Sequence, residues 1–183
     1  MRAVLIGRPK AAVRQIVWYW RLRHPQNHLR LHLGCGQKRL DGFVNIDQNF
    51  SAATDFICDI TKLPCPPNSV ERIETYHVIE HLPLPLVAPT LKSWHAILRK
   101  GGVFVVECPD LRADCQEFLT GNTERLFSIF GRQRFPGDAH HWGYTAESLC
   151  TLLREVGFEA PRTAEPIDYH SITEPCIRIE AVR

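Results

Sequence analysis

Short apolar runs alternate with segments of helical spacing from residue 29 onward, and this alternation limits the fold more than any other feature of the chain. Each run has the length of a typical strand and is bounded by residues that favour turns. Repeated units of this kind build a mostly parallel sheet with flanking helices, so we expect an α/β protein. Strands are predicted at 29–33, 43–47, 54–58, 72–77 and 102–108, and two more near 161–167 and 176–182.

Two helices are predicted between and after these strands. Residues 86–99 gather apolar side chains on one face and are followed by Gly101, which favours the end of a helix, while Pro89 is expected in the first turn. The second helix covers 145–156 and begins at Thr145, a good capping residue.

The stretch before residue 28 has a different character. No Asp or Glu precedes Asp41, and residues 9–23 place apolar groups at helical spacing among arginines. We therefore divide the chain into a basic amphipathic helix with a linker, 1–28, and an α/β domain, 29–183. The helix can lie in a membrane interface, or it can pack on the sheet over the ligand crevice with its aromatic rings buried. We favour packing, because exposed apolar surface promotes aggregation.

The composition of the chain limits the class of protein to which it can belong. Its 183 residues, 44% hydrophobic and 23% charged, suffice for a buried core, and a net charge of +2 indicates no particular partner. Seven cysteines lack any C-x-x-C pair, which is typical of a reducing compartment. Nothing near Met1 resembles a signal peptide, and no apolar run is long enough to span a bilayer, so neither a leader nor a membrane span is expected. We expect a cytoplasmic protein.

The strongest local motif is Leu31-His32-Leu33-Gly34-Cys35-Gly36, an apolar strand that runs directly into a glycine-rich turn. Glycines allow a ligand to approach the backbone closely. A dinucleotide site adds a third glycine where this chain has Arg39, and a P-loop would need a following Gly-Lys-Ser/Thr. Neither of these nucleotide sites is therefore favoured.

Acidic residues follow the next two predicted strands. Asp47 ends the second strand, and a carboxylate there can accept hydrogen bonds from ribose hydroxyls. Asp59 follows the third, where it could accept from an adenine amine while Ile60 packs on the ring. Ligands of parallel sheets bind at the carboxyl ends of the strands, so the pattern predicts a nucleoside site.

Three segments together carry a family resemblance: LHLGCGQKRLDGFVNID, CDITKLPCPPNSVERIETYHVIEHL and LRKGGVFVVECPD. They resemble the successive motifs of class I S-adenosylmethionine-dependent methyltransferases, over roughly residues 29–160. Within that superfamily the chain is similar to small bacterial-type predicted methyltransferases, some of which accompany enzymes of cell-surface sugar and polysaccharide assembly. The resemblance implies a Rossmann-like sheet with an antiparallel last strand, S-adenosylmethionine as cofactor and S-adenosylhomocysteine as product.

The resemblance also implies roles for individual residues. The turn would approach the methionine portion, the two acids would hold ribose and adenine, and one histidine would lie near the sulfonium and the acceptor. In chain order these cofactor-binding residues are Gly34, Cys35, Gly36, Asp47, Asp59, Ile60 and His77.

Two features depart from the family pattern. Many members carry an acid where this chain has His32, so the contact to the methionine amino group must come from elsewhere. The connection from Gly36 to Asp47 is shorter than an ordinary helical crossover, which predicts a turn in place of the first helix.

Catalytic candidates are His81, after the fourth strand, and His140 and His141, in the loop before the last helix. Methyl transfer from a sulfonium mainly requires alignment, and a base helps when the nucleophile is a hydroxyl. His81 could instead simply pack at the head of a helix. Asp138 with His140 and His141 could bind a metal, but no fourth ligand is evident, so no metal site is predicted.

The sequence says less about the molecule that accepts the methyl group than about the cofactor. No Asn-Pro-Pro-Tyr motif follows the fourth strand, which favours a hydroxyl or carboxyl acceptor on a small molecule or sugar, including a lipid-linked one. A nucleoside-binding partner or regulator without catalysis is the alternative from another class. RNA methylation ranks lower, because only the basic N-terminal stretch supports it and no RNA-binding module is present. Nucleic acid is therefore not an expected partner.

Overall fold

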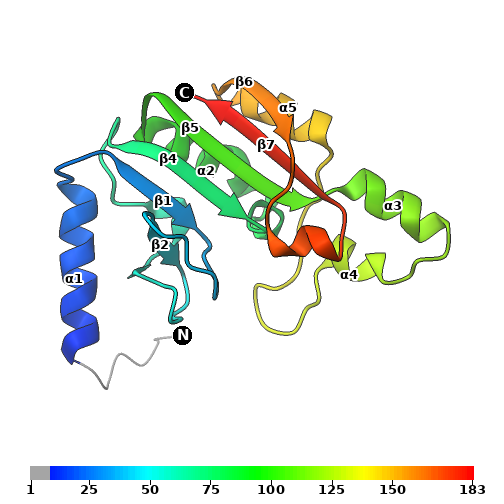
Figure 1. The fold of residues 1–183 in the computed structure, drawn as a ribbon, viewed down its shortest axis with the longest axis horizontal. Helices are drawn as coiled ribbons and strands as arrows, with labels where there is room; N and C mark the ends of the chain where they lie inside the picture. Colours follow the sequence, from blue (N-terminus) through cyan, green and yellow to red (C-terminus); the bar gives the residue numbers. More distant parts are fainter. Residues whose placement is uncertain (1–8) are drawn as a thin grey trace.

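The computed structural model describes residues 9–183, which form a sheet of seven strands in the order β3-β2-β1-β4-β5-β7-β6 (Figure 1). The strands β1 to β5 are parallel to one another, and β7 is antiparallel to both β5 and β6. The predicted α/β class and antiparallel last strand are confirmed. The strands are β1 (Leu29–Leu33), β2 (Val44–Asp47), β3 (Phe56–Ile57), β4 (Val70–Tyr76), β5 (Leu98–Pro109), β6 (Glu159–Ala164) and β7 (Cys176–Val182).

The helices are α1 (Pro9–Arg23), α2 (Leu84–Ile97), α3 (Leu111–Leu119), α4 (Arg125–Phe130) and α5 (Ala146–Glu155). The helices expected near 9–23, 86–99 and 145–156 are present, whereas α3 and α4 were not predicted. Pro89 lies inside α2 and not in its first turn, because the helix begins two residues earlier and Pro85 takes that position. Thr145 caps α5 as expected, accepting a hydrogen bond from the backbone N–H of Ser148.

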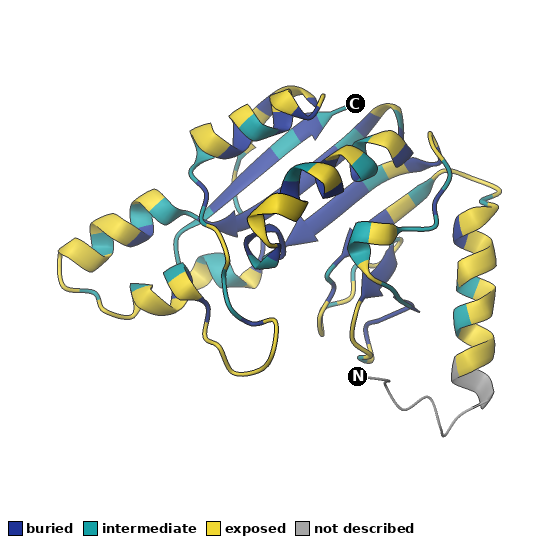
Figure 2. Cartoon of the chain, turned by 180° about the vertical axis from the view of Figure 1, so that it is seen from behind, coloured by how far each residue is buried: buried dark blue, intermediate teal, exposed yellow. Residues whose placement is uncertain are grey.

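The core lies between the sheet and the helices α2 and α5, which cover one face (Figure 2). Trp94 of α2 and Phe104 of β5 are both fully buried there, with ring centroids 5.9 Å apart. No helix lies between β1 and β2, so the predicted short crossover is confirmed, and none lies between β2 and β3. Loops alone therefore shape the carboxyl ends of these strands.

Helix α1 packs at the β3 edge of the sheet. The backbone N–H of Ile57 donates to Gln15 Oε1 at 2.9 Å, and Leu22 is fully buried. The expectation of buried aromatic rings is wrong for Tyr19 and Trp20, which are 43% and 58% exposed. Part of the predicted N-terminal segment, residues 1–8, lies outside the described residues. Within 9–183, none of the helices has the length and apolar character needed to cross a membrane.

Candidate functional site

A cavity of about 580 Å³ opens at the carboxyl ends of β1, β2 and β3. It falls within the size range of small-molecule sites. Six of the seven residues predicted to bind a cofactor line it, and Cys35 borders a neighbouring cavity instead. The six residues are Gly34, Gly36, Asp47, Asp59, Ile60 and His77.

The turn after β1 needs its two glycines for different reasons. Both have positive φ, +69° at Gly34 and +52° at Gly36, a conformation that L side chains rarely adopt. A Cβ at Gly34 would collide with the side chain of Val78, so that glycine permits close packing. A Cβ at Gly36 would meet no protein atom within 4 Å and would point into open space. The backbone at Gly36 is therefore accessible to a ligand.

Asp47 ties the ends of β1 and β2 together. Its carboxylate accepts the backbone N–H of Gly36 at 2.9 Å through Oδ2 and that of Asn49 at 2.7 Å through Oδ1. A carboxylate has about four acceptor positions, so two remain for a ligand. Two backbone donors fix the side chain of Asp47, which borders the cavity.

Asp59 and Ile60 follow β3 and line the same cavity. Asp59 begins a 3₁₀ turn, Ile60–Lys62, and its Oδ1 accepts hydrogen bonds from the backbone N–H and hydroxyl of Thr61 at 2.9 and 2.7 Å. These bonds lower the pKa of Asp59, keeping it an acceptor. The indole N–H of Trp94 donates to the carbonyl of Ile60 at 2.9 Å, which fixes this turn to the core.

A second cavity, of about 470 Å³, adjoins the first. The two cavities share five residues that mark their junction: Gly34, Gly36, Gln37, His77 and His81. His32 borders the second cavity and hydrogen-bonds Asn45 Oδ1 at 2.9 Å through Nδ1. Burial lowers the pKa of His32, which favours the neutral imidazole.

His77 follows β4 at the junction, with a positive φ of 52°. Its Nδ1 lies 3.4 Å from Glu80 Oε1, and its Nε2 lies 3.6 Å from Cys176 Sγ. Burial lowers the pKa of His77, but the contacts with Cys176 and Glu80 outweigh it and raise the pKa to about 10. These contacts favour the protonated form of His77.

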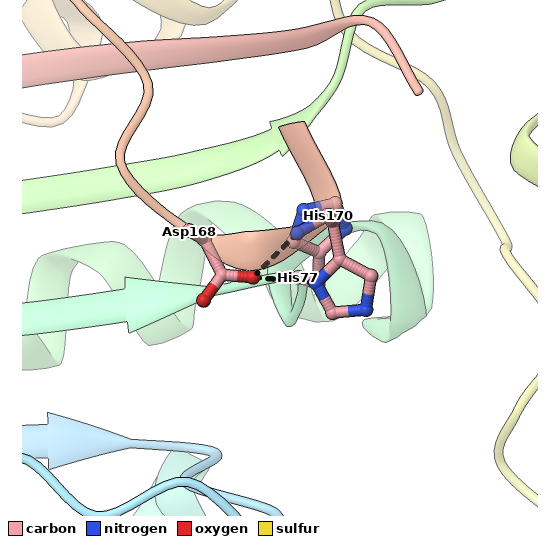
Figure 3. Close-up of side chains that lie close together, drawn as sticks. All are labelled: His77, Asp168 and His170. Atoms are coloured by element: carbon pink, nitrogen blue, oxygen red, sulfur yellow. Dashed lines mark hydrogen bonds and ion pairs between the residues drawn. The ribbon is translucent and has the colours of Figure 1, made fainter. Parts of the chain in front are cut away.

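An Asp–His pair that the sequence analysis missed, Asp168 and His170, lies beside His77 (Figure 3). Both residues border the second cavity. His170 Nδ1 lies 2.5 Å from Asp168 Oδ1, and Lys38 Nζ lies 2.7 Å from Asp168 Oδ2. The ring of His170 lies against that of His77, with centroids 4.0 Å apart and a tilt of 38° between the planes. Since Asp168 orients Nδ1, the other ring nitrogen of His170 is left to accept a proton. The only sequence signal was an acid two residues before a histidine in a loop.

The three histidines predicted as catalytic differ in their placement. His81 borders both cavities, and His140 packs edge-to-face against it at 4.7 Å between ring centroids. His141 is exposed and borders neither cavity. Asp138, the carboxylate considered for a metal, has both oxygens bound by Arg134. The structure thus brings His81 and His140 together and leaves His141 outside.

Solved structures share this fold over nearly the whole chain. A SAM-dependent methyltransferase from Archaeoglobus fulgidus matches at 14% identity and a TM-score of 0.59, covering 95% of this chain and 92% of its own. A SAM-dependent methyltransferase from Methanosarcina mazei matches at 16% identity and a TM-score of 0.56, covering 87% and 92%. The 1,6-didemethyltoxoflavin-N1-methyltransferase of Burkholderia thailandensis, solved with bound S-adenosylhomocysteine, matches at 14% identity and a TM-score of 0.59, covering 96% and 77%.

No family model matches the chain, and no curated protein matches it. At sequence identities of 14 to 16%, the similarity to these solved structures establishes the fold alone. The strand order with an antiparallel β7 is the class I methyltransferase topology.

Proposed function

We propose that this chain, which has the class I methyltransferase fold, binds S-adenosylmethionine in the 580 Å³ cavity and transfers its methyl group to a hydroxyl-bearing small molecule or sugar. One observation carries the proposal. The accessible backbone of Gly36 is hydrogen-bonded to a buried carboxylate, Asp47, at the edge of the sheet where ligands of parallel α/β folds bind.

We assign the residues that line the cavity to successive parts of the cofactor. Ile60 offers an apolar surface to adenine beside the acceptor Asp59, and Asp47 offers its free acceptor positions to the ribose. The glycine turn leads from there to the junction, where the methionine portion would place its sulfonium. The second cavity, with Lys38 among its lining residues, then receives the remainder of the methionine and the acceptor.

The transfer is an in-line displacement. The acceptor oxygen forms a bond to the methyl carbon while the bond from that carbon to sulfur breaks, and the sulfur keeps the electron pair as neutral S-adenosylhomocysteine. The hydroxyl proton must leave, and His170 is the base we assign, because Asp168 orients it and it borders the second cavity. Fixed placement of donor and acceptor supplies the rest of the catalysis.

The surroundings of the junction favour a polar acceptor. Lys38, Arg134 and Tyr169 border the second cavity, and an exposed tyrosine ring can stack on a sugar while the cations bind its oxygens. A lipid-linked sugar also fits, since α1 exposes Val13 and Ile16, both 59% exposed, on a helix whose last turn carries Arg21 and Arg23. We therefore include contact with an anionic membrane surface in the proposal.

Calorimetric titration with S-adenosylhomocysteine, followed by acceptor screening with methyl-labelled donor, tests the proposal. Binding together with transfer that is lost in His170→Ala supports it. Binding by a well-folded protein that transfers to no acceptor would favour the alternative, a nucleoside-binding module without catalysis.

A further inference from the structure

The carboxylate of Glu80 is unusual for a buried charge. The residue is 1% exposed, and neither side-chain oxygen has a hydrogen bond within the described part of the chain. His77 is at ion-pair distance, 3.4 Å from Oε1. A buried carboxylate without hydrogen bonds is destabilising unless a cation or another donor satisfies it. His77 faces only Oε1, so we infer that the carboxylate of Glu80 has a further partner, which lies on the side away from His77.

Two imidazoles lie around this carboxylate with their tautomers fixed. His81 Nδ1 lies 3.1 Å from the carbonyl oxygen of Ala139, and His140 Nδ1 lies 2.7 Å from that of Ser128. A carbonyl can only accept, so each Nδ1 carries the hydrogen and each Nε2 carries the lone pair. Metal-binding histidines are typically held in this way, with the second ring nitrogen donating to a backbone carbonyl.

We propose that Glu80, His81 and His140 bind a divalent transition-metal ion such as zinc. One ligand atom from each of the three lies within 4.8 Å of the others, close enough to converge on one ion after small side-chain movements. Two imidazoles and a carboxylate form a set that binds zinc and similar ions, and three protein ligands leave a position open.

The open position would face the junction, because His81 borders both cavities. There the ion would bind the acceptor oxygen and lower the pKa of its hydroxyl, a role that rests on the proposed methyl transfer. Metal binding itself does not depend on that role.

A second group of possible ligands, His77, Asp168 and His170, is less suited to a cation. Lys38 already occupies one oxygen of Asp168 at 2.7 Å, and His170 occupies the other at 2.5 Å. Within the described residues, neither oxygen of Glu80 has a hydrogen bond, and His77 lies at ion-pair distance from Oε1 only. A small cavity of about 10 Å³ beside Glu80 has room for about one water molecule, which is the competing explanation for its unpaired oxygens.

Calorimetric titration of the chelator-treated full chain with zinc tests the proposal. We expect one ion per chain, and an affinity lowered by about 100-fold or more in Glu80→Gln and in His140→Ala. His141→Ala is the matched control, since the neighbouring histidine is exposed and lies outside the cluster, and its zinc affinity should be unchanged. Cobalt should give an absorption spectrum without thiolate charge-transfer bands, which excludes binding at the free cysteines.

Absent zinc binding, or equal affinity in all variants, would overturn the metal site and leave water as the partner of Glu80. Titration of the same samples with S-adenosylhomocysteine separates this result from a failure of the proposed function. Retained cofactor binding in Glu80→Gln also shows that the variant is folded. Zinc binding without cofactor binding would keep the metal site and refute the methyltransferase proposal.

Discussion

The carboxylate of Glu107, on β5, accepts the backbone N–H of Asp168 at 2.9 Å, joining the sheet to a loop sixty-one residues further along the chain. Its other oxygen accepts the N–H of Ile167 at 3.1 Å, and Glu107 is fully buried. These two bonds place the pair of Asp168 and His170 beside the junction of the cavities. The base that we assign is therefore held by a strand residue that does not itself border either cavity.

Replacing Glu107 with Gln should loosen this loop. An amide offers only one acceptor oxygen, so one backbone N–H loses its partner, at a cost of about 1.5 to 3 kcal/mol for a bond to a charged group. Amide hydrogen exchange in the segment 165–170 should accelerate, while affinity for S-adenosylhomocysteine changes little. Glu180→Gln is the control, because Glu180 pairs with Arg162 and Arg178 on the same sheet. Equal exchange in both variants would contradict the positioning role.

Alanine substitutions at Gly36, in the glycine turn, and at Gly101 can be compared directly, because both residues have a positive φ. Gly36 and Gly101 have φ values of +52° and +70°, and a Cβ at either would meet no atom within 4 Å. Alanine should therefore destabilise the fold similarly at both sites, by about 1 kcal/mol. Only Gly36 borders the cavity, so only Gly36→Ala should weaken S-adenosylhomocysteine binding, by about tenfold or more, measured by calorimetry. Similar affinities in the two variants would argue against ligand contact at Gly36.

The sequence predicts well those elements whose conformation depends mainly on residues close together in the chain. The strands and the glycine turn follow from apolar runs and turn residues close together in the chain, and most of the predicted cofactor residues line one cavity. The short helices α3 and α4 were missed, since each buries little apolar surface to mark its face. The pairing of Asp168 with His170 was missed because Glu107, distant in sequence, positions that loop.

The buried Asp168 should contribute a pH-dependent part of the stability. Burial raises its pKa, but the hydrogen bonds from His170 and Lys38 outweigh this and hold the pKa well below its ordinary value. A depressed pKa stabilises the fold above the unfolded value, about 4, and this contribution disappears as the pH falls toward the folded pKa.

Asp168→Asn should therefore lower the free energy of unfolding most near neutral pH, and the difference from the native chain should shrink below about pH 4. Urea unfolding at several pH values measures this. Asp41→Asn, at an exposed position, serves as the control. A difference that stays constant down to about pH 2 would show that the ionised carboxylate does not stabilise the fold.

Helix α1 provides a test of membrane contact. Ile16 and Trp20 are 59% and 58% exposed and lie about one turn apart, so replacing both with Glu should reduce sedimentation with anionic lipid vesicles several-fold. Leu119→Glu, at an 82% exposed site on α3, should leave sedimentation unchanged. If the native chain does not sediment with such vesicles, the membrane part of the proposal is wrong.

The central claim is that the 580 Å³ cavity binds S-adenosylmethionine with Asp47 on the ribose. Isothermal titration of the native chain and of Asp47→Ala with S-adenosylhomocysteine tests it most directly. We predict one site per chain with micromolar or tighter affinity, about −8 kcal/mol, and a loss of about 1.5 to 3 kcal/mol in the variant. No binding by the folded native chain, or the same affinity in Asp47→Ala, would contradict the account.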